Sequence, residues 1–268
     1  MAHKTLVGGT AYEIKGGKTL VNGTAYEISN GKTLVGGTKY DISFFPKIGS
    51  LPVGSSVFMN FNTYSNGIES KEFIVVQQGK PSAMYDDSCE GTWLWAKTGF
   101  GDYYDGTFSA HNADSNDYAK LQLHTLILKS TVLAKFDSAI QSIIKDVKIP
   151  YHNGTGRNGS ISSGSNGLST KLFALSAVEV GVAANNYTPA DGSCLSYFSS
   201  NAAERRKTGV GWLRSPYLYS DSELWAVSSD GSIFHSTVRA SITACGAFVL
   251  PSSTFVSLGS DNKWHVLT

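Results

Sequence analysis

The amino-terminal segment repeats itself, and the repeat restricts what this part of the chain can fold into. Units of the KTLVGGTAYEI type begin at Lys4, Lys18 and Lys32, a period of fourteen residues. Each unit holds two short β-prone stretches around a turn such as Asn22-Gly23, a pattern that predicts a β-hairpin. One hairpin cannot bury its own apolar side, so we expect the units to stack on one another or on copies from other chains. Residues 1–45 are therefore predicted to form a β-repeat stalk or oligomerisation segment.

The rest of the chain, residues 46–268, has the composition of one globular domain. Hydrophobic residues make up 41% of the sequence, which is typical of a folded chain. Lys and Arg number 22 and Asp and Glu 21, a net charge of +1 that gives no electrostatic attraction to nucleic acid. No apolar run reaches the roughly 18 residues that cross a bilayer, and no signal-peptide pattern opens the sequence. We expect neither nucleic-acid binding nor membrane insertion.

Short strands alternate with turns in this domain, and a single stretch has helical periodicity. Leu121, Leu128, Phe136 and Ile140 recur at helical spacing within residues 117–145, with Asp137 as the N-cap of the second part. The Gly/Ser/Asn-rich residues 153–168 are predicted to be a loop, and residues 171–180 a strand or short helix. The mixture predicts the α+β class. Strands are predicted at residues 56–62, 72–78, 92–95, 147–151, 211–214, 223–227, 232–235, 247–250 and 255–257.

The sequence contains no established catalytic motif. Asp102, Asp105, Asp114 and Asp117 could supply the paired carboxylates of a glycosidase, although a solvated loop is the simpler interpretation. Residues 112–117 place oxygen ligands at alternate positions but lack the Gly and the closing Glu of a calcium loop. The six histidines are scattered and form no ligand pair. We therefore predict no catalytic residue, no metal site and no cofactor.

The three cysteines show no pattern of a metal site or a redox motif. Cys89, Cys194 and Cys245 are far apart in the sequence, and at least one must be unpaired within the chain. We expect buried or half-buried free thiols. A bridge between Cys89 and Cys194 is the alternative.

Residues 215–245 stand out because large aromatic side chains occur in polar, turn-rich sequence. Tyr217, Tyr219, Phe234, His235 and Arg239 lie among Ser and Asp residues. Tyr and Arg anchors surrounded by small polar residues are typical of protein recognition surfaces. The alternative interpretation is a set of plain strands in a β-rich half of the domain.

Five segments of the domain also resemble a known family when they are taken in order. They resemble a phage and prophage family with a C-type-lectin-like fold, shared with formylglycine-generating enzymes; its DUF6273-like members are variable proteins of diversity-generating retroelements. The repeat resembles a stalk found ahead of such domains in tail proteins of phages that infect Firmicutes. The segments are residues 87–93, 147–151, 192–198, 211–216 and 247–252.

The resemblance implies a phage tail receptor-binding (host-adhesion) protein without catalysis. Residues 46–268 would be the ligand-binding domain, with a variable face near residues 217–245. In such proteins a reverse transcriptase misreads template adenines, and Asn codons changed in this way cannot encode Lys, Glu, Gln, Met or Trp. Only Glu223 and Trp225 between positions 217 and 245 fall outside the permitted set. The contact residues implied are Tyr217, Leu218, Tyr219, Asp221, Glu223, Val227, Phe234, His235, Ser236, Arg239 and Ser241. The framework residues implied are Trp212, Leu213, Trp225, Phe248 and Leu250.

One departure from the family pattern affects the end of the variable window. Relatives usually carry Gly-Val-Arg-Pro where this chain has Thr243-Ala244-Cys245-Gly246. Cys245 is therefore open to interpretation as a diversified or a structural residue.

The resemblance also implies partners and a location. The partners would be a host cell-surface protein or glycan, other phage tail proteins and further copies of this chain, with a trimer favoured by the stalk and by the symmetry of tail fibres. The protein would be made in the bacterial cytoplasm without a signal peptide and would act outside the cell, in the virion, at the tail tip or fibre. Two alternatives remain: a structural tail protein, and a tail-associated enzyme, either a glycan hydrolase using the Asp102–Asp117 acids or a relative of formylglycine-generating enzymes using Cys194 and Cys245.

Overall fold

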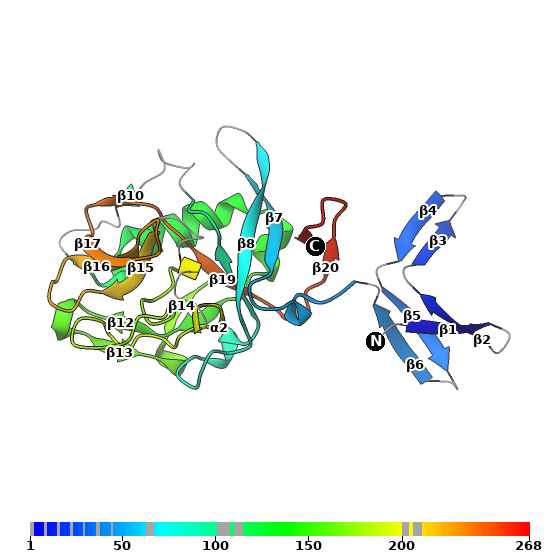
Figure 1. The fold of residues 1–268 in the computed structure, drawn as a ribbon, viewed down its shortest axis with the longest axis horizontal. Coiled ribbons are helices and arrows are strands. Elements are labelled where there is room, and N and C mark those ends of the chain that lie inside the picture. Colours follow the sequence, from blue (N-terminus) through cyan, green and yellow to red (C-terminus); the bar gives the residue numbers. More distant parts are fainter. Residues whose placement is uncertain are drawn as a thin grey trace.

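The computed structural model describes most of the chain. The backbone is described for residues 3–7, 10–14, 17–21, 24–28, 30–35, 38–43 and 108–109. Backbone and side chains are described for residues 45–62, 67–100, 115–199, 204–205 and 211–268. The repeat and the larger part of the fold are drawn in Figure 1.

Each repeat unit forms one antiparallel hairpin. Val7 pairs with Thr10, Val21 with Thr24, and the third unit repeats the register at the same positions. A two-residue connection fits the Gly-Gly and Asn-Gly pairs between the strands. The predicted hairpins are therefore confirmed, each as a separate two-stranded sheet. The turn residues, and the side chains on which stacking depends, lie outside the described residues. The strands are β1 (His3–Val7), β2 (Thr10–Ile14), β3 (Gly17–Val21), β4 (Thr24–Ile28), β5 (Asn30–Val35) and β6 (Thr38–Ser43).

A six-stranded mixed sheet is the centre of the fold (Figure 1). Its order is β19-β9-β8-β7-β21-β20, and all neighbours are antiparallel except β21 and β7. The predictions for residues 56–62 and 247–250 match two strands residue for residue, whereas β8 begins before the predicted position. The strands are β7 (Ser56–Asn62), β8 (Ile68–Gln78), β9 (Thr92–Ala96), β19 (Ala247–Leu250), β20 (Val256–Leu258) and β21 (Trp264–Val266).

Both faces of this sheet are covered, because alternate residues of its strands enter two different hydrophobic clusters. Phe73, Leu94 and Phe248 belong to the first cluster, and Trp93 and Val249 to the second. All five side chains are fully buried. Strands buried on two faces have continuous apolar sequence, which is why residues 92–96 and 247–250 show no polar alternation.

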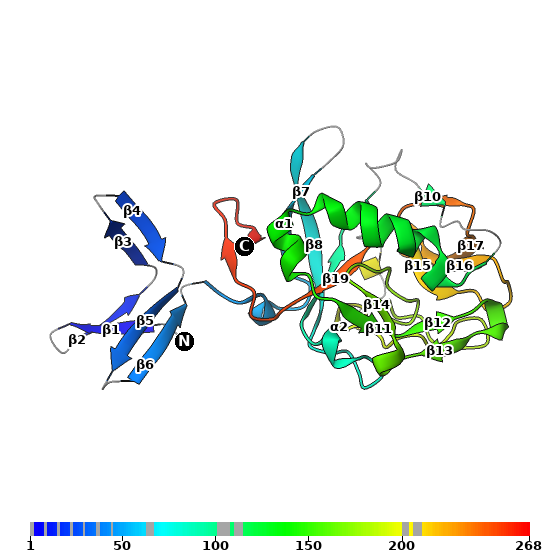
Figure 2. The ribbon, with the colours of Figure 1, turned by 180° about the vertical axis from the view of Figure 1, so that it is seen from behind.

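Short helical segments cover the first face, as Figure 2 shows in green. Two helical parts within residues 117–145, the second capped by Asp137, were the expectation, and the structure divides this stretch further. Phe136 leaves the helical conformation with ψ 150° and forms an isolated β-bridge with Phe61. Asp137 then precedes a new helix, as predicted. The pieces are the 3₁₀ turn η4 (Tyr118–Lys120), the π-helix η5 (Leu123–Val132), the 3₁₀ turn η6 (Leu133–Lys135) and the α-helix α1 (Ser138–Ile143).

Smaller sheets complete the domain. The predicted loop at residues 153–168 is wrong in part, because it contains a strand that pairs residue by residue with Tyr151–Asn153. Residues 171–180 form no regular element and pair with the main sheet only through a bridge between Phe173 and Ala247. The remaining strands are β10 (Phe108–Ser109), β11 (Val147–Ile149), β12 (Tyr151–Asn153), β13 (Ser160–Ser162), β14 (Leu168–Thr170), β15 (Gly211–Pro216), β16 (Glu223–Val227), β17 (Ile233–Thr237) and β18 (Ser241–Ile242).

A buried ion pair joins these segments. Arg214 on β15 and Glu179 have no exposed side-chain surface, and their two N···O distances are both 2.6 Å. The other three N–H groups of Arg214 donate to the carbonyl oxygens of Pro150, Ala174 and Asp191, each at 3.0 Å. Glu179 also accepts from the Tyr85 hydroxyl at 2.6 Å and from the Ser176 amide at 2.8 Å. Every donor of the guanidinium is used, which is the condition under which a buried pair is stable.

A second buried carboxyl lies beside this pair. Asp191 accepts a hydrogen bond from the hydroxyl of Ser215, whose oxygen accepts one from the amide of Ala177. Burial raises the pKa of Asp191 to about 7, against the lowering effects of Arg214 and Ser215. Trp212 and Leu213 enter the first and second hydrophobic clusters. The segment Trp212–Ser215 thus contributes side chains to both clusters and to both polar contacts.

The cysteines are free thiols and the Cys89–Cys194 bridge is absent, as expected, but Cys194 is exposed and not buried or half-buried. Cys89 and Cys245 are buried, and burial raises the pKa of each to about 12. Burial also raises the pKa of Cys194, which is exposed. Cys245 is 3% exposed and packs in the second hydrophobic cluster, so it occupies a structural position.

The ion pair predicts a large loss of stability when one charge is removed. Glu179→Gln leaves the Arg214 charge buried without a countercharge, and we expect the free energy of unfolding to fall by about 3–5 kcal/mol. Denaturant unfolding followed by tryptophan fluorescence measures the change. Lys80→Ala is the control, because its ion pair with Asp87 lies at the surface and should leave the midpoint nearly unchanged. Equal midpoints for the two variants would contradict the assigned role.

Candidate functional site

The candidate site is an exposed aromatic cluster on the three-stranded sheet β15-β16-β17. This sheet and the β12-β13 pair lie at the end of the domain away from β20 (Figures 1 and 2). Residues 217–222 connect β15 to β16, and the amide of Tyr217 donates to the carbonyl of Glu223 at 2.9 Å to close the connection. Trp225 of β16 pairs with His235 of β17, so their side chains share one face of the sheet.

Five rings contact one another in this cluster, which comprises Tyr187, Tyr217, Tyr219, Trp225 and His235. The Tyr217 and His235 rings stack with centroids 3.9 Å apart and planes 2° apart. Trp225 meets both of them edge-on. The centroid of the Tyr187 ring lies 4.7 Å from that of Tyr219 and 5.9 Å from that of Tyr217. Tyr219 is 53% exposed and Tyr187 46%, so the cluster offers aromatic surface to solvent.

Charged groups lie at two positions of the cluster. The guanidinium carbon of Arg157 is 3.6 Å from the centre of the Tyr219 ring, a close cation–π contact. At the second position, Nδ1 of His235 is 3.5 Å from a carboxylate oxygen of Glu223. The cluster therefore combines flat apolar faces with one cation and one carboxylate, a composition typical of binding hot spots.

Asn116 holds the backbone beneath the cluster. Its side-chain amide donates to the carbonyl oxygens of Ser220 and Glu223 at 2.7 and 2.8 Å. Its side-chain oxygen accepts from the amide of Gly156 at 3.1 Å. Gly156 has φ +45°, and a Cβ there would lie 2.4 Å from Asp221. Asn116 is fully buried, so it ties the Arg157 loop to the connection between β15 and β16 from below.

The structure divides the residues that the resemblance assigns as contacts. Tyr219, Asp221, His235, Arg239 and Ser241 are exposed, and Tyr217, Leu218 and Glu223 are half-buried. The remaining three, discussed next, are Val227, Phe234 and Ser236.

Val227 is a correction to the predicted contact set. It is 1% exposed and packs in the second hydrophobic cluster, because the end of β16 runs over that cluster. Phe234 is half-buried against the first hydrophobic cluster. Phe234 and Ser236 are the immediate neighbours of His235 on β17, so strand alternation directs both side chains away from the aromatic cluster.

Sequence reasoning missed two members of the site. Tyr187 and Arg157 lie 30 or more positions before Tyr217 and come from loops that the fold brings to β16. No local pattern marks them. Trp225 was expected to be framework; it packs against the second hydrophobic cluster, yet its ring also belongs to the exposed cluster. The other framework residues, Trp212, Leu213, Phe248 and Leu250, are buried as the resemblance implies.

The structure describes only some of the residues on which the enzymatic alternatives depend. Asp102, Asp105 and Asp114 lie outside the described residues, and Asp117 is buried in an ion pair with Lys120. In the segment considered for calcium, residues 112–117, the Asn116 side chain hydrogen-bonds to backbone groups. The raised pKa values of all three cysteines disfavour a reactive thiolate. Within the described ranges, no three His, Cys, Asp or Glu side chains are placed to hold a metal ion.

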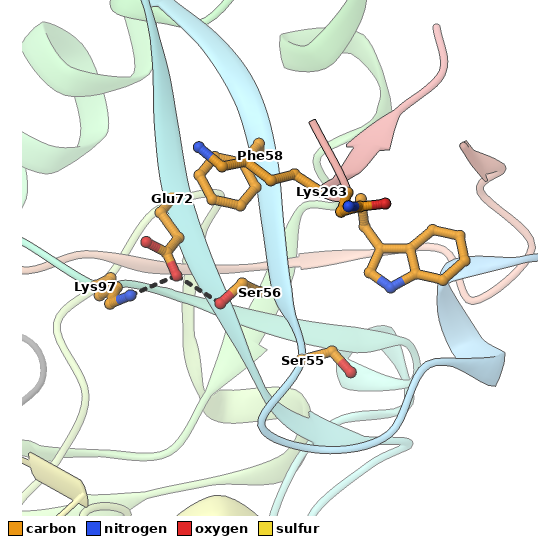
Figure 3. A pocket seen from close by; sticks show the side chains of 8 residues that line it. Ser55, Ser56, Phe58, Glu72, Lys97 and Lys263 are labelled. Atoms are coloured by element: carbon orange, nitrogen blue, oxygen red, sulfur yellow. Dashed lines mark hydrogen bonds and ion pairs between the residues drawn. The ribbon is translucent and has the colours of Figure 1, made fainter. Parts of the chain in front are cut away.

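A separate hollow of about 470 Å³ lies beside β7 and β21 (Figure 3). Glu72 accepts hydrogen bonds there from Ser56 and from Lys97, the latter at 2.6 Å. Lys263 lies over the Phe58 ring at 4.4 Å. These charged groups already have partners within the chain. The hollow is therefore a weaker candidate for a binding site than the aromatic cluster.

The fold and the site together define a mixed α+β domain that carries an exposed aromatic cluster on a small antiparallel sheet. No helix in the described part of the chain is long and apolar enough to span a bilayer. The chain belongs to the DUF6273 family, described as a domain of unknown function, whose family model matches residues 82–252. The match includes every member of the aromatic cluster. Comparison with curated proteins and with solved structures finds no match.

The role of Asn116 leads to a prediction about the site. Asn116→Ala removes the side-chain donor to the Ser220 carbonyl, one of the two donors to the Glu223 carbonyl and the acceptor of the Gly156 amide, and we expect the free energy of unfolding to fall by about 2–3 kcal/mol. Hydrogen exchange should also increase in residues 217–223 before it increases in the central sheet. Asn186→Ala, at an exposed position, is the matched control. Unchanged exchange in residues 217–223 would contradict the anchoring role.

Proposed function

We propose that this chain is a receptor-binding protein of a phage tail, and that its aromatic cluster binds a protein or glycan of the host cell surface. The observation that carries the proposal is the exposed cluster of five rings with Arg157 at one side. Tyr and Trp side chains supply large contact area with few rotatable bonds, so they bind partners at low entropic cost. In this proposal the cluster acts by binding, with no catalytic step, metal or cofactor.

The finer parts of the proposal rest on the sequence resemblance. The DUF6273 domain would have a C-type-lectin-like fold, and the hairpin repeat of residues 1–45 would be a stalk that assembles copies of the chain, with a trimer favoured. The protein would then work in the virion, at the tail tip or fibre, beside other tail proteins. Several copies on one tail would compensate for weak single contacts through avidity.

Cell binding tests the proposal directly. Tyr219→Ala removes an exposed ring of the cluster, and we expect binding of the tagged full-length protein to candidate host bacteria to fall at least about tenfold. Flow cytometry measures the bound protein. Leu258→Ala is the matched control, because Leu258 is 54% exposed against 53% for Tyr219 and lies on β20.

Two outcomes would overturn the cell-binding proposal. One is that the wild-type protein binds no cells of the panel. The other is that Tyr219→Ala and Leu258→Ala bind equally well. Loss of tail assembly in Tyr219→Ala, without loss of cell binding, would favour a structural tail protein whose aromatic cluster is covered by a neighbour.

Diversification by a retroelement makes its own prediction at the DNA level. Among isolates of one phage lineage, changes should concentrate at exposed codons of the window, such as those of Tyr219, Asp221 and His235. The codons of buried Leu224, Val227 and Val238 should stay constant, because new side chains there would disturb the core. Sequencing the locus measures this. A window as constant as residues 147–151 would exclude diversification here.

A further inference from the structure

A groove of about 430 Å³ adjoins the aromatic cluster, and Leu218 lines it. Its volume lies in the range of roughly 300–1,000 Å³ that is usual for small-molecule sites. Three chain segments line it, within residues 152–161 and 184–190 and at Leu218. The same segments carry Arg157, Tyr187 and the Tyr217–Tyr219 connection, so the groove and the cluster share their supports.

The turn at residues 185–188 joins the two features. The carbonyl of Tyr187 accepts from the amide of Leu218 at 3.0 Å and from the indole N–H of Trp225 at 3.4 Å. The Asn185 side-chain oxygen accepts from the amides of Tyr187 and Thr188 at 2.7 and 3.2 Å. These bonds fix the turn with the Tyr187 ring in the cluster and Thr188 in the wall of the groove.

Two polar side-chain atoms on residues that line the groove have no hydrogen-bond partner among the described residues. They are the Thr188 hydroxyl and Nδ1 of His152, on residues that are 1% and 5% exposed. A buried polar group without a partner costs about 1–3 kcal/mol, so two of them in one groove wall call for an explanation. Each can donate or accept a hydrogen bond, depending on its rotor or tautomer.

The lining of the groove is uncharged. Ile161, Pro189, Ala190 and Leu218 provide apolar surface, and burial lowers the pKa of His152 against the raising effects of the Gly154 backbone and Asp117, which favours the neutral imidazole. A charged ligand would be desolvated there without a countercharge, which disfavours it. A ligand that combines C–H surface with uncharged hydroxyl groups matches both the apolar walls and the two unpartnered groups.

We propose that this groove binds a neutral sugar unit, whose hydroxyl groups hydrogen-bond to Thr188 and His152 while its C–H face packs on Leu218 and Pro189. The proposal deepens the proposed function, because it assigns a chemical class to part of the host ligand. The adjoining rings of Tyr187 and Tyr219 would then contact the next units of a glycan, or the surface that carries it.

Two substitutions test the groove with the full-length protein. Thr188→Val removes the hydroxyl but keeps the side-chain shape, and we expect the affinity for the sugar to fall about tenfold. Because that hydroxyl makes no hydrogen bond within the described chain, the variant should be at least as stable as the wild type. Ala184→Phe fills the groove from an exposed position and should abolish binding. Ala183→Phe, one residue away and outside the lining, is the matched control and should bind normally.

The probes are glucose, galactose, mannose, rhamnose, N-acetylglucosamine and N-acetylgalactosamine, with glucuronic acid and glucosamine as charged comparators. Saturation-transfer NMR and calorimetry report binding. Binding of at least one neutral sugar that is lost in Thr188→Val and Ala184→Phe, and kept in Ala183→Phe, supports the proposal. Overturning outcomes are no binding of any neutral probe, binding that both variants retain, or stronger binding of a charged comparator.

The cell-binding assay separates this proposal from the proposed function. Wild-type protein that binds host cells through Tyr219 but binds no neutral sugar leaves the receptor-binding function standing and removes the groove from it. Protein that binds a neutral sugar through Thr188 but binds no host cells would support the sugar site and contradict the receptor-binding function.

Discussion

The salt bridge between Glu179 and Arg214 is the contact on which the rest of this domain depends. Arg214 belongs to β15 of the small sheet, and its hydrogen bonds reach Pro150 between β11 and β12, the irregular residues 171–180 and the turn at Asp191. Irregular backbone cannot be buried unless its polar groups have partners. Arg214 and Glu179 supply those partners, so a stretch without helix or strand can pack beneath the candidate site.

Residues outside the candidate site hold its backbone in place. Asn116, Gly156 and Arg214 fix the backbone around residues 211–223 from below, and none of them belongs to the exposed cluster. Surface side chains such as Tyr219 and His235 therefore contribute little to folding. A scaffold of this kind tolerates changes in what it presents, because backbone position and surface chemistry are controlled by different residues.

The sequence predicted those parts of the fold whose signals are local. Strands such as β7, β16 and β19 have runs of β-branched and aromatic residues, and each hairpin of the repeat has its turn pair, so both were found. The β12-β13 pair was missed because its Gly and Ser residues resemble loop composition; its pairing depends on tertiary contacts. The helical stretch of residues 117–145 and the start of its second part at Asp137 were predicted, but periodicity does not register the bridge between Phe136 and Phe61 or the change to π-helical and 3₁₀ segments. Val227 was misplaced for a similar reason, since strand alternation does not reveal which hydrophobic cluster lies under the end of β16.

Tyr187 has a consequence for any repertoire built on this scaffold. It supplies an exposed ring to the cluster, yet it lies 30 positions before Tyr217, the start of the segment proposed to vary. Variants that differ throughout residues 217–245 would all keep this ring in the same place. Such a repertoire would not sample ligands evenly: every member would retain one fixed flat surface, and targets with a planar or C–H-rich patch would be favoured from the start.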